Sequence, residues 1–138
     1  MAKIIHLSEA ASLGIHAMVL IAQQDTQVKV NDLAEQIGAS RNHLAKVLQQ
    51  VVKFGYLRSV RGPGGGFRLN KPVSQISILD IYEAIEGKIE MPDCPLDRPL
   101  CPFNMCLMSN LLTDVTTTVR EYFKNSTLEG FTSKEYKK

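Results

Sequence analysis

The fold of this chain is decided by residues 30–71, which read VNDLAEQIGASRNHLAKVLQQVVKFGYLRSVRGPGGGFRLNK. Asn31 can cap a short helix that Gly38 ends, and Ser40 can cap a longer helix over residues 41–54. The apolar side chains of the longer helix recur at steps of three and four residues, which gives it one apolar face. Two such helices joined by a tight turn predict a helix-turn-helix.

A glycine-rich loop follows the helix pair. Residues 56–60 and 67–69 alternate apolar and polar side chains on either side of Gly62 to Gly66, as the strands of a β-hairpin do. The loop is not a nucleotide-binding P-loop, because no Gly-Lys-Ser/Thr follows and the next element is a strand. We therefore predict a mainly α fold with a small β-hairpin, which is a winged helix. The predicted domain covers residues 1–87, with the helix-turn-helix at about 31–54 and the wing at about 56–69.

Charge is segregated along the chain. Residues 41–71 contain seven Lys or Arg and no Asp or Glu, whereas the whole chain carries only +2, so the remainder carries 2 − 7 = −5. This pattern favours a surface that binds a polyanion over a merely solvated face. In a winged helix, the second helix of the pair enters the major groove, and an arginine beside the wing suits a narrow minor groove.

The predicted DNA-binding residues are Ser40, Arg41, Asn42, His43, Lys46, Arg61, Gly62, Gly64, Gly65 and Gly66. Arg41 and Asn42 suit base edges, whereas Lys46, Lys53 and Lys71 suit phosphates. The alternative for the three consecutive glycines is that they only form a tight hairpin.

The rest of the chain predicts further helices. Residues 8–22 have a helical pattern, and Ser77 with Asp80 has the spacing of a capping box for a helix that ends at Gly87. Prolines between residues 91 and 102 exclude regular helix there. A final helix at 107–125, which Asn104 could cap, has an apolar stripe near heptad spacing, and we expect this stripe to form a dimer interface. Residues 126–138 are expected to form a frayed polar tail.

Composition limits the class of protein. A chain of 138 residues that is 44% hydrophobic is long enough for one domain with a proper core. Its apolar stretch at residues 13–22 is too short to span a membrane and lacks a small-residue cleavage site, so a cytoplasmic location is expected.

The three cysteines, Cys94, Cys101 and Cys106, are too few and too irregular for a disulfide scaffold. Thiolates on one loop can surround iron, whereas zinc favours close CxxC pairs, which are absent. Ordinary buried thiols are the alternative, which the polar, proline-rich loop disfavours.

The wing sequence SVRGPGGGF at residues 59–67, the helix-turn-helix and the three cysteines before a long final helix closely resemble the Rrf2 family of bacterial winged-helix transcription regulators, of the IscR, NsrR, RsrR and CymR type. The resemblance covers about residues 4–125. It implies a homodimer that binds an inverted-repeat operator in double-stranded DNA, with the final helices crossing between subunits. In members that carry an iron–sulfur cluster, three cysteines bind iron, and a fourth ligand comes from just after the last cysteine or from the partner's first helix.

This chain departs from the IscR pattern at the fourth ligand. Ser109 stands three residues after the last cysteine, where that pattern has histidine. On the first helix, Glu9, Ser12 and His16 share one face. Aligned with the family, Ser12 occupies the position of an aspartate ligand and His16 that of a histidine ligand. His16 is thus the candidate fourth ligand from the partner subunit, ahead of Glu9 or Ser12. The alternative is that His16 is an ordinary surface or interface histidine. For Glu9 and His6, an ordinary surface side chain is the favoured interpretation.

We therefore predict a dimeric, sequence-specific transcription regulator that is not an enzyme. It is expected to be a repressor controlled by a 2Fe-2S or 4Fe-4S cluster that senses redox state, nitric oxide or iron–sulfur status. One alternative is a cluster-free regulator of the same fold, controlled by thiol oxidation or a partner protein. A thiol redox enzyme is a second alternative, which the absence of a CxxC pair or a nucleophile–base pair disfavours.

Overall fold

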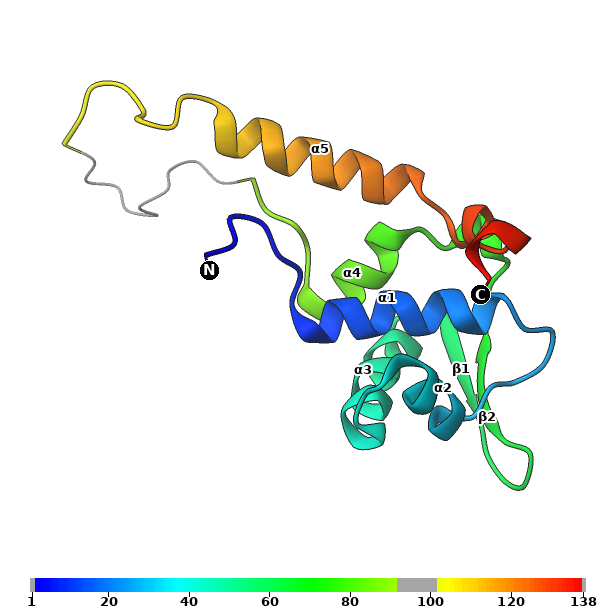
Figure 1. Cartoon of the computed structure of the whole chain (residues 1–138). Coiled ribbons are helices and arrows are strands. Elements are labelled where there is room, and N and C mark those ends of the chain that lie inside the picture. The colour runs from blue at the N-terminus through cyan, green and yellow to red at the C-terminus, as the bar shows by residue number, and fades with distance from the viewer. Residues whose placement is uncertain (1, 92–101, 138) are drawn as a thin grey trace.

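The computed structural model describes residues 2–91 and 102–137. Its elements follow the order α1 (Glu9–Ala22), α2 (Val30–Ile37), α3 (Arg41–Lys53), β1 (Leu57–Val60), β2 (Gly66–Leu69), η1 (Val73–Gln75), α4 (Ile78–Glu86), α5 (Leu111–Asn125), η2 (Leu128–Phe131) and η3 (Lys134–Tyr136). In Figure 1, α2, α3 and the hairpin lie on one side of α1, whereas α5 lies on the other side. The predicted winged helix is confirmed. None of the helices in the described parts of the chain is both long and apolar enough to cross a membrane.

Helix α1 lies at the centre of the hydrophobic core. Ser8 caps it by accepting a hydrogen bond from the Ala11 N–H at 3.1 Å. It packs against α2, α3 and α4. Gly14 allows the close approach of α4, because a Cβ atom at this position would lie 2.2 Å from Cδ1 of Ile85. Any side chain at position 14 would therefore require the end of the Ile85 side chain to move.

The helix-turn-helix forms where the sequence predicts it. Gly38 ends α2 with a left-handed φ of 76°, which glycine adopts without steric cost. Ser40 caps α3 as predicted, through a hydrogen bond from the His43 N–H. The start of α2 differs, because the helix begins at Val30 with Lys29 as its N-cap, so the prediction that Asn31 caps it is wrong.

The wing is an antiparallel hairpin in which Leu57 pairs with Leu69 and Val60 with Gly66. The connection before α2 extends this sheet, since Val28 and Phe67 exchange two backbone hydrogen bonds of 2.9 and 2.7 Å. Gly66 permits this contact, because a Cβ atom there would lie 2.4 Å from the Val28 carbonyl oxygen. The root of the wing is therefore fixed to the helix-turn-helix by its backbone.

Helix α4 begins with the predicted capping box. The Ser77 N–H donates to Asp80, and the Asp80 N–H donates to the Ser77 hydroxyl, both at 3.0 Å. Gly87 ends the helix, also as predicted. Both ends of α4 are thus determined by local sequence.

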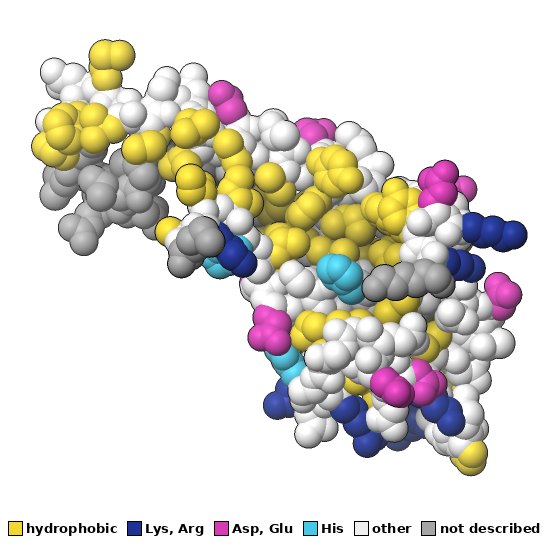
Figure 2. All heavy atoms as spheres, viewed as in Figure 1, with side chains coloured by type: hydrophobic (Ala, Val, Ile, Leu, Met, Phe, Trp, Pro, Cys, Tyr) yellow, Lys and Arg dark blue, Asp and Glu magenta, His cyan; other side chains and the backbone are white. Residues whose placement is uncertain are grey.

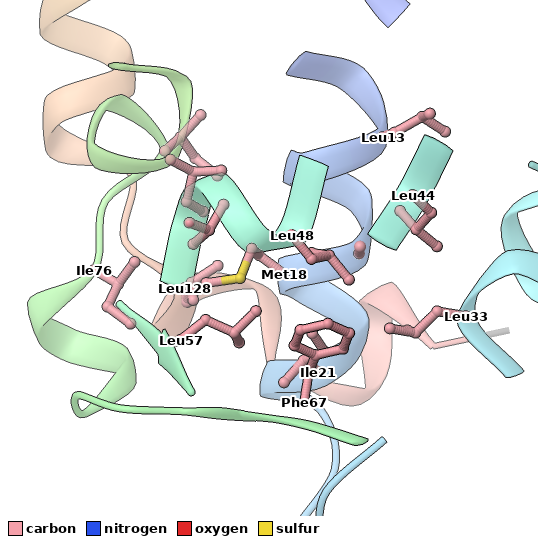
Figure 3. Packing of buried hydrophobic residues seen from close by; sticks show 14 of the residues in the cluster. Leu13, Met18, Ile21, Leu33, Leu44, Leu48, Leu57, Phe67, Ile76 and Leu128 are labelled. Carbon is pink, nitrogen blue, oxygen red and sulfur yellow. The ribbon is translucent and has the colours of Figure 1, made fainter. Parts of the chain in front are cut away.

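The prediction of a frayed polar tail is wrong for residues 126–131. Leu128 is fully buried, and Figure 3 shows it beside Met18, Leu57 and Ile76 in the core. Backbone hydrogen bonds from Ile78 to Ser126 and from Leu128 to Ile76 hold this segment beside the start of α4. The prediction failed because one buried leucine outweighs its polar neighbours. The core of the winged helix therefore includes a residue that lies beyond α5.

Helix α5 begins at Leu111, four residues after the predicted start at 107. Asn104 does not cap it, so that prediction is wrong; Asn110 occupies the N-cap position without a side-chain hydrogen bond. The preceding turn includes Ser109 at a φ of 54°, in the left-handed region. This backbone conformation is incompatible with a helix that begins earlier.

Candidate functional site

The first residues of α3 are available to a ligand. Arg41, Asn42 and Lys46 are exposed, whereas His43 is half-buried and Leu44, one residue on, lies in the core. The apolar stripe of α3 therefore holds the helix against the core while its N-terminal residues face outward. The guanidinium of Arg41 and the amide of Asn42 can each form two hydrogen bonds to a base edge in the major groove.

The wing presents a second exposed group. Arg61, Gly62 and Gly64 are exposed, and Gly65 and Gly66 are half-buried where the loop approaches the rest of the protein. The structure thus brings Arg61 and the loop glycines to the same side of α1 as α3 (Figure 1). Figure 2 shows Lys and Arg side chains along this end of the molecule, whereas hydrophobic side chains gather at the opposite end over α5.

Two residues of this surface were missed by the sequence analysis. The Gln27 amide donates a hydrogen bond of 2.8 Å to the Gly64 carbonyl oxygen, across 37 positions of the chain. Lys29, together with Arg41, lines the hollow between the helix-turn-helix and the wing. Neither residue lies in a motif, and only the basic character of Lys29 could have indicated a role.

The two other lysines predicted to bind phosphate lie at the edges of this surface. Lys53 is exposed in the last turn of α3. Lys71 lies with its Nζ atom 5.0 Å from the ring centroid of Tyr56, a cation–π contact at the root of the wing. The ammonium of Lys71 is therefore positioned by the hairpin itself.

Tyr56 connects the root of the wing to α4. Burial raises the pKa of the Tyr56 phenol above its usual value of 10.0, and the Asp80 and Glu83 carboxylates on α4 raise it further. Asp80, which also belongs to the capping box of α4, therefore lies near the phenol at the root of the wing.

One of the three candidate cluster ligands can be located. Cys106 is a free, exposed thiol five residues before α5, whereas Cys94 and Cys101 lie outside the described residues. Within residues 2–91 and 102–137, the structure contains no group of three or more His, Cys, Asp or Glu side chains that could hold a metal ion. Any cluster would therefore depend on the segment that contains the other two cysteines.

The candidate fourth ligand has a suitable hydrogen bond. His16 is exposed on α1, and its Nδ1 atom lies 2.6 Å from the Ser12 carbonyl oxygen. A carbonyl only accepts, so Nδ1 carries the proton in this contact, and in the neutral imidazole the lone pair is then on Nε2. Histidines that bind metals commonly donate their other N–H to such a carbonyl. Glu9 and His6 are exposed and Ser12 is half-buried.

A long apolar surface flanks Cys106. Its exposed side chains are Phe103, Met105, Leu107, Met108 and Leu111. No residue of α5 is buried, although the helix packs on α4 through a ring contact of 5.7 Å between Phe123 and Tyr82. The predicted apolar stripe is thus largely uncovered within one chain.

The fold and its basic surface define a winged-helix, DNA-binding transcription regulator. A family model named Rrf2, described as an iron-dependent transcriptional regulator, matches residues 7–134. The chain therefore belongs to the Rrf2 family, as its sequence predicted. It is a regulator and not an enzyme, which excludes the thiol redox enzyme.

Individual relatives support this assignment. The chain is 29% identical over 124 residues to the transcriptional regulator IscR of Yersinia pseudotuberculosis, which covers 88% of this chain and 76% of IscR. It is 40% identical over 81 residues to the regulator BadM of Rhodopseudomonas palustris, which covers 58% of this chain and only 52% of BadM. This second match thus spans about half the length of BadM.

Solved structures show the same fold. CymR, the global cysteine regulator of B. subtilis, superposes with a TM-score of 0.78 at 21% identity, over 94% of this chain and 97% of CymR. IscR of T. potens superposes with a TM-score of 0.73 at 24% identity, over 91% of this chain and 84% of that chain.

Proposed function

We propose that the protein is a homodimeric repressor that binds an inverted-repeat operator. The observation that carries this proposal is that Arg41, Asn42 and Lys46 are exposed at the same end of the molecule as Arg61. Helix α3 would enter the major groove and the wing an adjacent minor groove. In a dimer the two α3 helices would contact half-sites about 34 to 36 Å apart on one face of the duplex.

The apolar surface of α5 supports the dimer. Leu111 and Tyr122 are 55% and 64% exposed, and each would lose unfavourable contact with water on packing against another apolar surface. A second copy of α5 offers the same stripe, and a symmetric dimer buries one patch against itself. The location of α5 on the side of α1 opposite α3 would leave both recognition helices free (Figure 1).

An iron–sulfur cluster is proposed to regulate the affinity for DNA. Cys94, Cys101 and Cys106 would bind iron, with His16 of the partner subunit as the candidate fourth ligand, ahead of Glu9 or Ser12. The exposed thiol of Cys106 and the free Nε2 of His16 fit such a donor set. A bound cluster would supply one-electron redox chemistry and react with nitric oxide.

The position of Cys106 suggests how the signal reaches DNA. The thiol lies five residues before α5, and the far end of α5 continues into the segment anchored by Leu128 in the core. A displacement of the cysteine segment would move α5 against α4. This movement would change the relative populations of dimers with different α3 spacing, and so the operator affinity.

The DNA-binding proposal is tested with purified protein and genomic fragments. Once selection has identified an operator, Arg61→Ala should weaken binding to it substantially, because it removes the arginine that begins the wing loop. Lys53→Ala should weaken binding to all duplexes by a similar factor, as expected for a phosphate contact. Unchanged affinity in both variants would show that the docking is wrong.

The cluster proposal is tested by anaerobic purification, with iron and sulfide analysis and absorption spectra. Wild type should contain both elements, and His16→Ala should alter the spectrum or lose iron while the three cysteines remain. A colourless, iron-free protein that still binds its operator would instead support the cluster-free regulator, in which Cys106 responds by thiol oxidation or through a partner protein.

A further inference from the structure

A hollow lies between the helix-turn-helix and the wing, and residues of both predicted groove-reading elements line it. One wall consists of Lys29, Val30, Asn31 and Arg41, and the other of Ser59, Val60 and the wing residues 62–67. Lys29, Asn31, Arg41 and Ser59 are all exposed, so their polar groups are available to a ligand. The hollow therefore offers two cations and two neutral polar side chains.

The charge of this hollow distinguishes it from its neighbour. A second hollow, between the end of α1 and α2, is lined by several glutamines and by Asp32 and Glu35, whose carboxylates repel an anion. The hollow beside the wing has no carboxylate among its lining residues in the described parts of the chain. Its electrostatic character thus favours an anion.

The width of the hollow is set by the fold. Gln27 holds the wing loop through its bond to Gly64, and the Val28–Phe67 backbone pair fixes the wing to the residue directly before Lys29. These contacts hold the two walls in place without a ligand. The site is preorganised, and binding would require little further ordering.

Its position identifies the anion. This step depends on the proposed docking, in which α3 occupies a major groove and the wing an adjacent minor groove. Adjacent grooves of B-DNA are separated by one sugar-phosphate strand, so a hollow between the two reading elements must lie over that strand.

We propose that this hollow is a phosphate-binding site for that strand, with Lys29 as its principal cation and Asn31 and Ser59 as hydrogen-bond donors. The site positions the protein on DNA and reads no bases. Arg41 forms the shared edge between this site and the major-groove surface.

The test compares Lys29→Ala with wild type by fluorescence anisotropy over a range of salt concentrations, on an operator duplex and on a scrambled duplex. Removal of one charge-assisted phosphate contact should weaken binding to both duplexes by the same factor, about tenfold at low salt. The slope of log affinity against log salt should fall by about one. Lys29→Arg should retain most of the affinity, and Lys124→Ala, an exposed lysine on α5, should behave as wild type.

A second measurement identifies the phosphate itself. In a series of duplexes that each carry one methylphosphonate, a single phosphate is neutral in each duplex. Neutralising the phosphate between the two bound grooves should lower the affinity of wild type for DNA but should not lower that of Lys29→Ala further.

Unchanged affinity and slope in Lys29→Ala would overturn this proposal, as would a loss of affinity confined to the operator. If Arg61→Ala is still impaired in that case, the general docking stands; if wild type binds no duplex, the proposed function fails as well. Lys29→Ala and wild type should unfold at the same temperature, which would show that the loss of binding is not a loss of folding. Lys29→Gln, a second neutral variant, should lose the same affinity for DNA.

Discussion

Helices α1 and α5 have nearly the same length but opposite environments. Helix α1 has 14 residues, six of them buried, whereas α5 has 15 residues and none is buried. Both pack against α4, but α1 also contacts α2, α3 and the segment after α5. Helix α1 therefore organises the DNA-binding body, whereas α5 is attached to that body and keeps an apolar surface that another partner can cover.

The two ends of α5 also have different environments. At its C-terminal end, the ring of Phe123 packs against that of Tyr82 in a tilted contact, and the chain then places Leu128 in the core. At its N-terminal end, Leu111 and the preceding Leu107 are more than half exposed. One end of α5 is therefore fixed to the DNA-binding body, and the other is available to the cysteine segment and to a second subunit.

The largest expected effect is at the fixed end. Leu128→Ala should destabilise the protein by about 2 to 5 kcal/mol, because it leaves a cavity among fully buried side chains. Urea unfolding followed by circular dichroism measures this effect. A loss of less than about 0.5 kcal/mol, the usual range for surface substitutions, would show that this end of α5 is not anchored by Leu128.

A smaller effect is expected at the free end. Leu111→Ala should weaken self-association by about 1 to 2 kcal/mol, or roughly 5- to 30-fold, while the fold is retained. Sedimentation equilibrium measures the dimer affinity. Glu121→Ala, an exposed polar position on the same helix, serves as the control. Unaltered association in Leu111→Ala would exclude this part of α5 from the dimer interface.

The C-terminal end of α1 provides a third test, because the glutamines that follow it have different partners. Gln27 holds the wing loop, whereas Gln23 donates to the Phe131 carbonyl oxygen at 3.0 Å. Gln27→Ala should lower operator affinity by about 0.5 to 1.5 kcal/mol, the typical contribution of one hydrogen bond. Anisotropy titration against Gln24→Ala, an exposed glutamine of the same loop, tests this. Equal affinities would mean that the wing needs no support from Gln27.

The last and weakest effect concerns α4, the helix against which both α1 and α5 pack. Because the pKa of Tyr56 is raised in the folded protein, the unfolded phenol ionises first as pH rises. The contribution of Tyr56 to stability should therefore be complete below about pH 10 and be lost as pH rises from there through the folded pKa. Urea unfolding of Tyr56→Phe should show a weaker alkaline loss of stability than wild type. Parallel pH profiles would show that folding does not raise the pKa of Tyr56.

Local rules predicted much of the fold. The cap at Ser40, the capping box at Ser77 and the helix ends at Gly38 and Gly87 depend on residues within a few positions of each other, and all are present. The exposed basic residues of α3 and the wing were also predictable, since charged side chains are rarely buried without a partner. Their roles at DNA remain predictions.

The errors have a common origin in contacts between distant residues. The burial of Leu128 depends on α1 and the wing, and the bond from Gln27 to Gly64 joins elements 37 positions apart. The late start of α5 follows from the left-handed turn at Ser109, which propensity alone does not reveal. The predicted ligands Cys94 and Cys101 lie outside the described residues, so that part of the candidate site stays a prediction.

The winged-helix class and the basic surface follow from the sequence, because periodicity, helix caps and charge are properties of neighbouring residues. Three features become visible only in the folded chain: residues after α5 complete the core, α5 is anchored at one end, and a basic hollow with Lys29 on its wall separates α3 from the wing. These features depend on which distant segments pack together, and burial of apolar surface across the whole chain determines that choice.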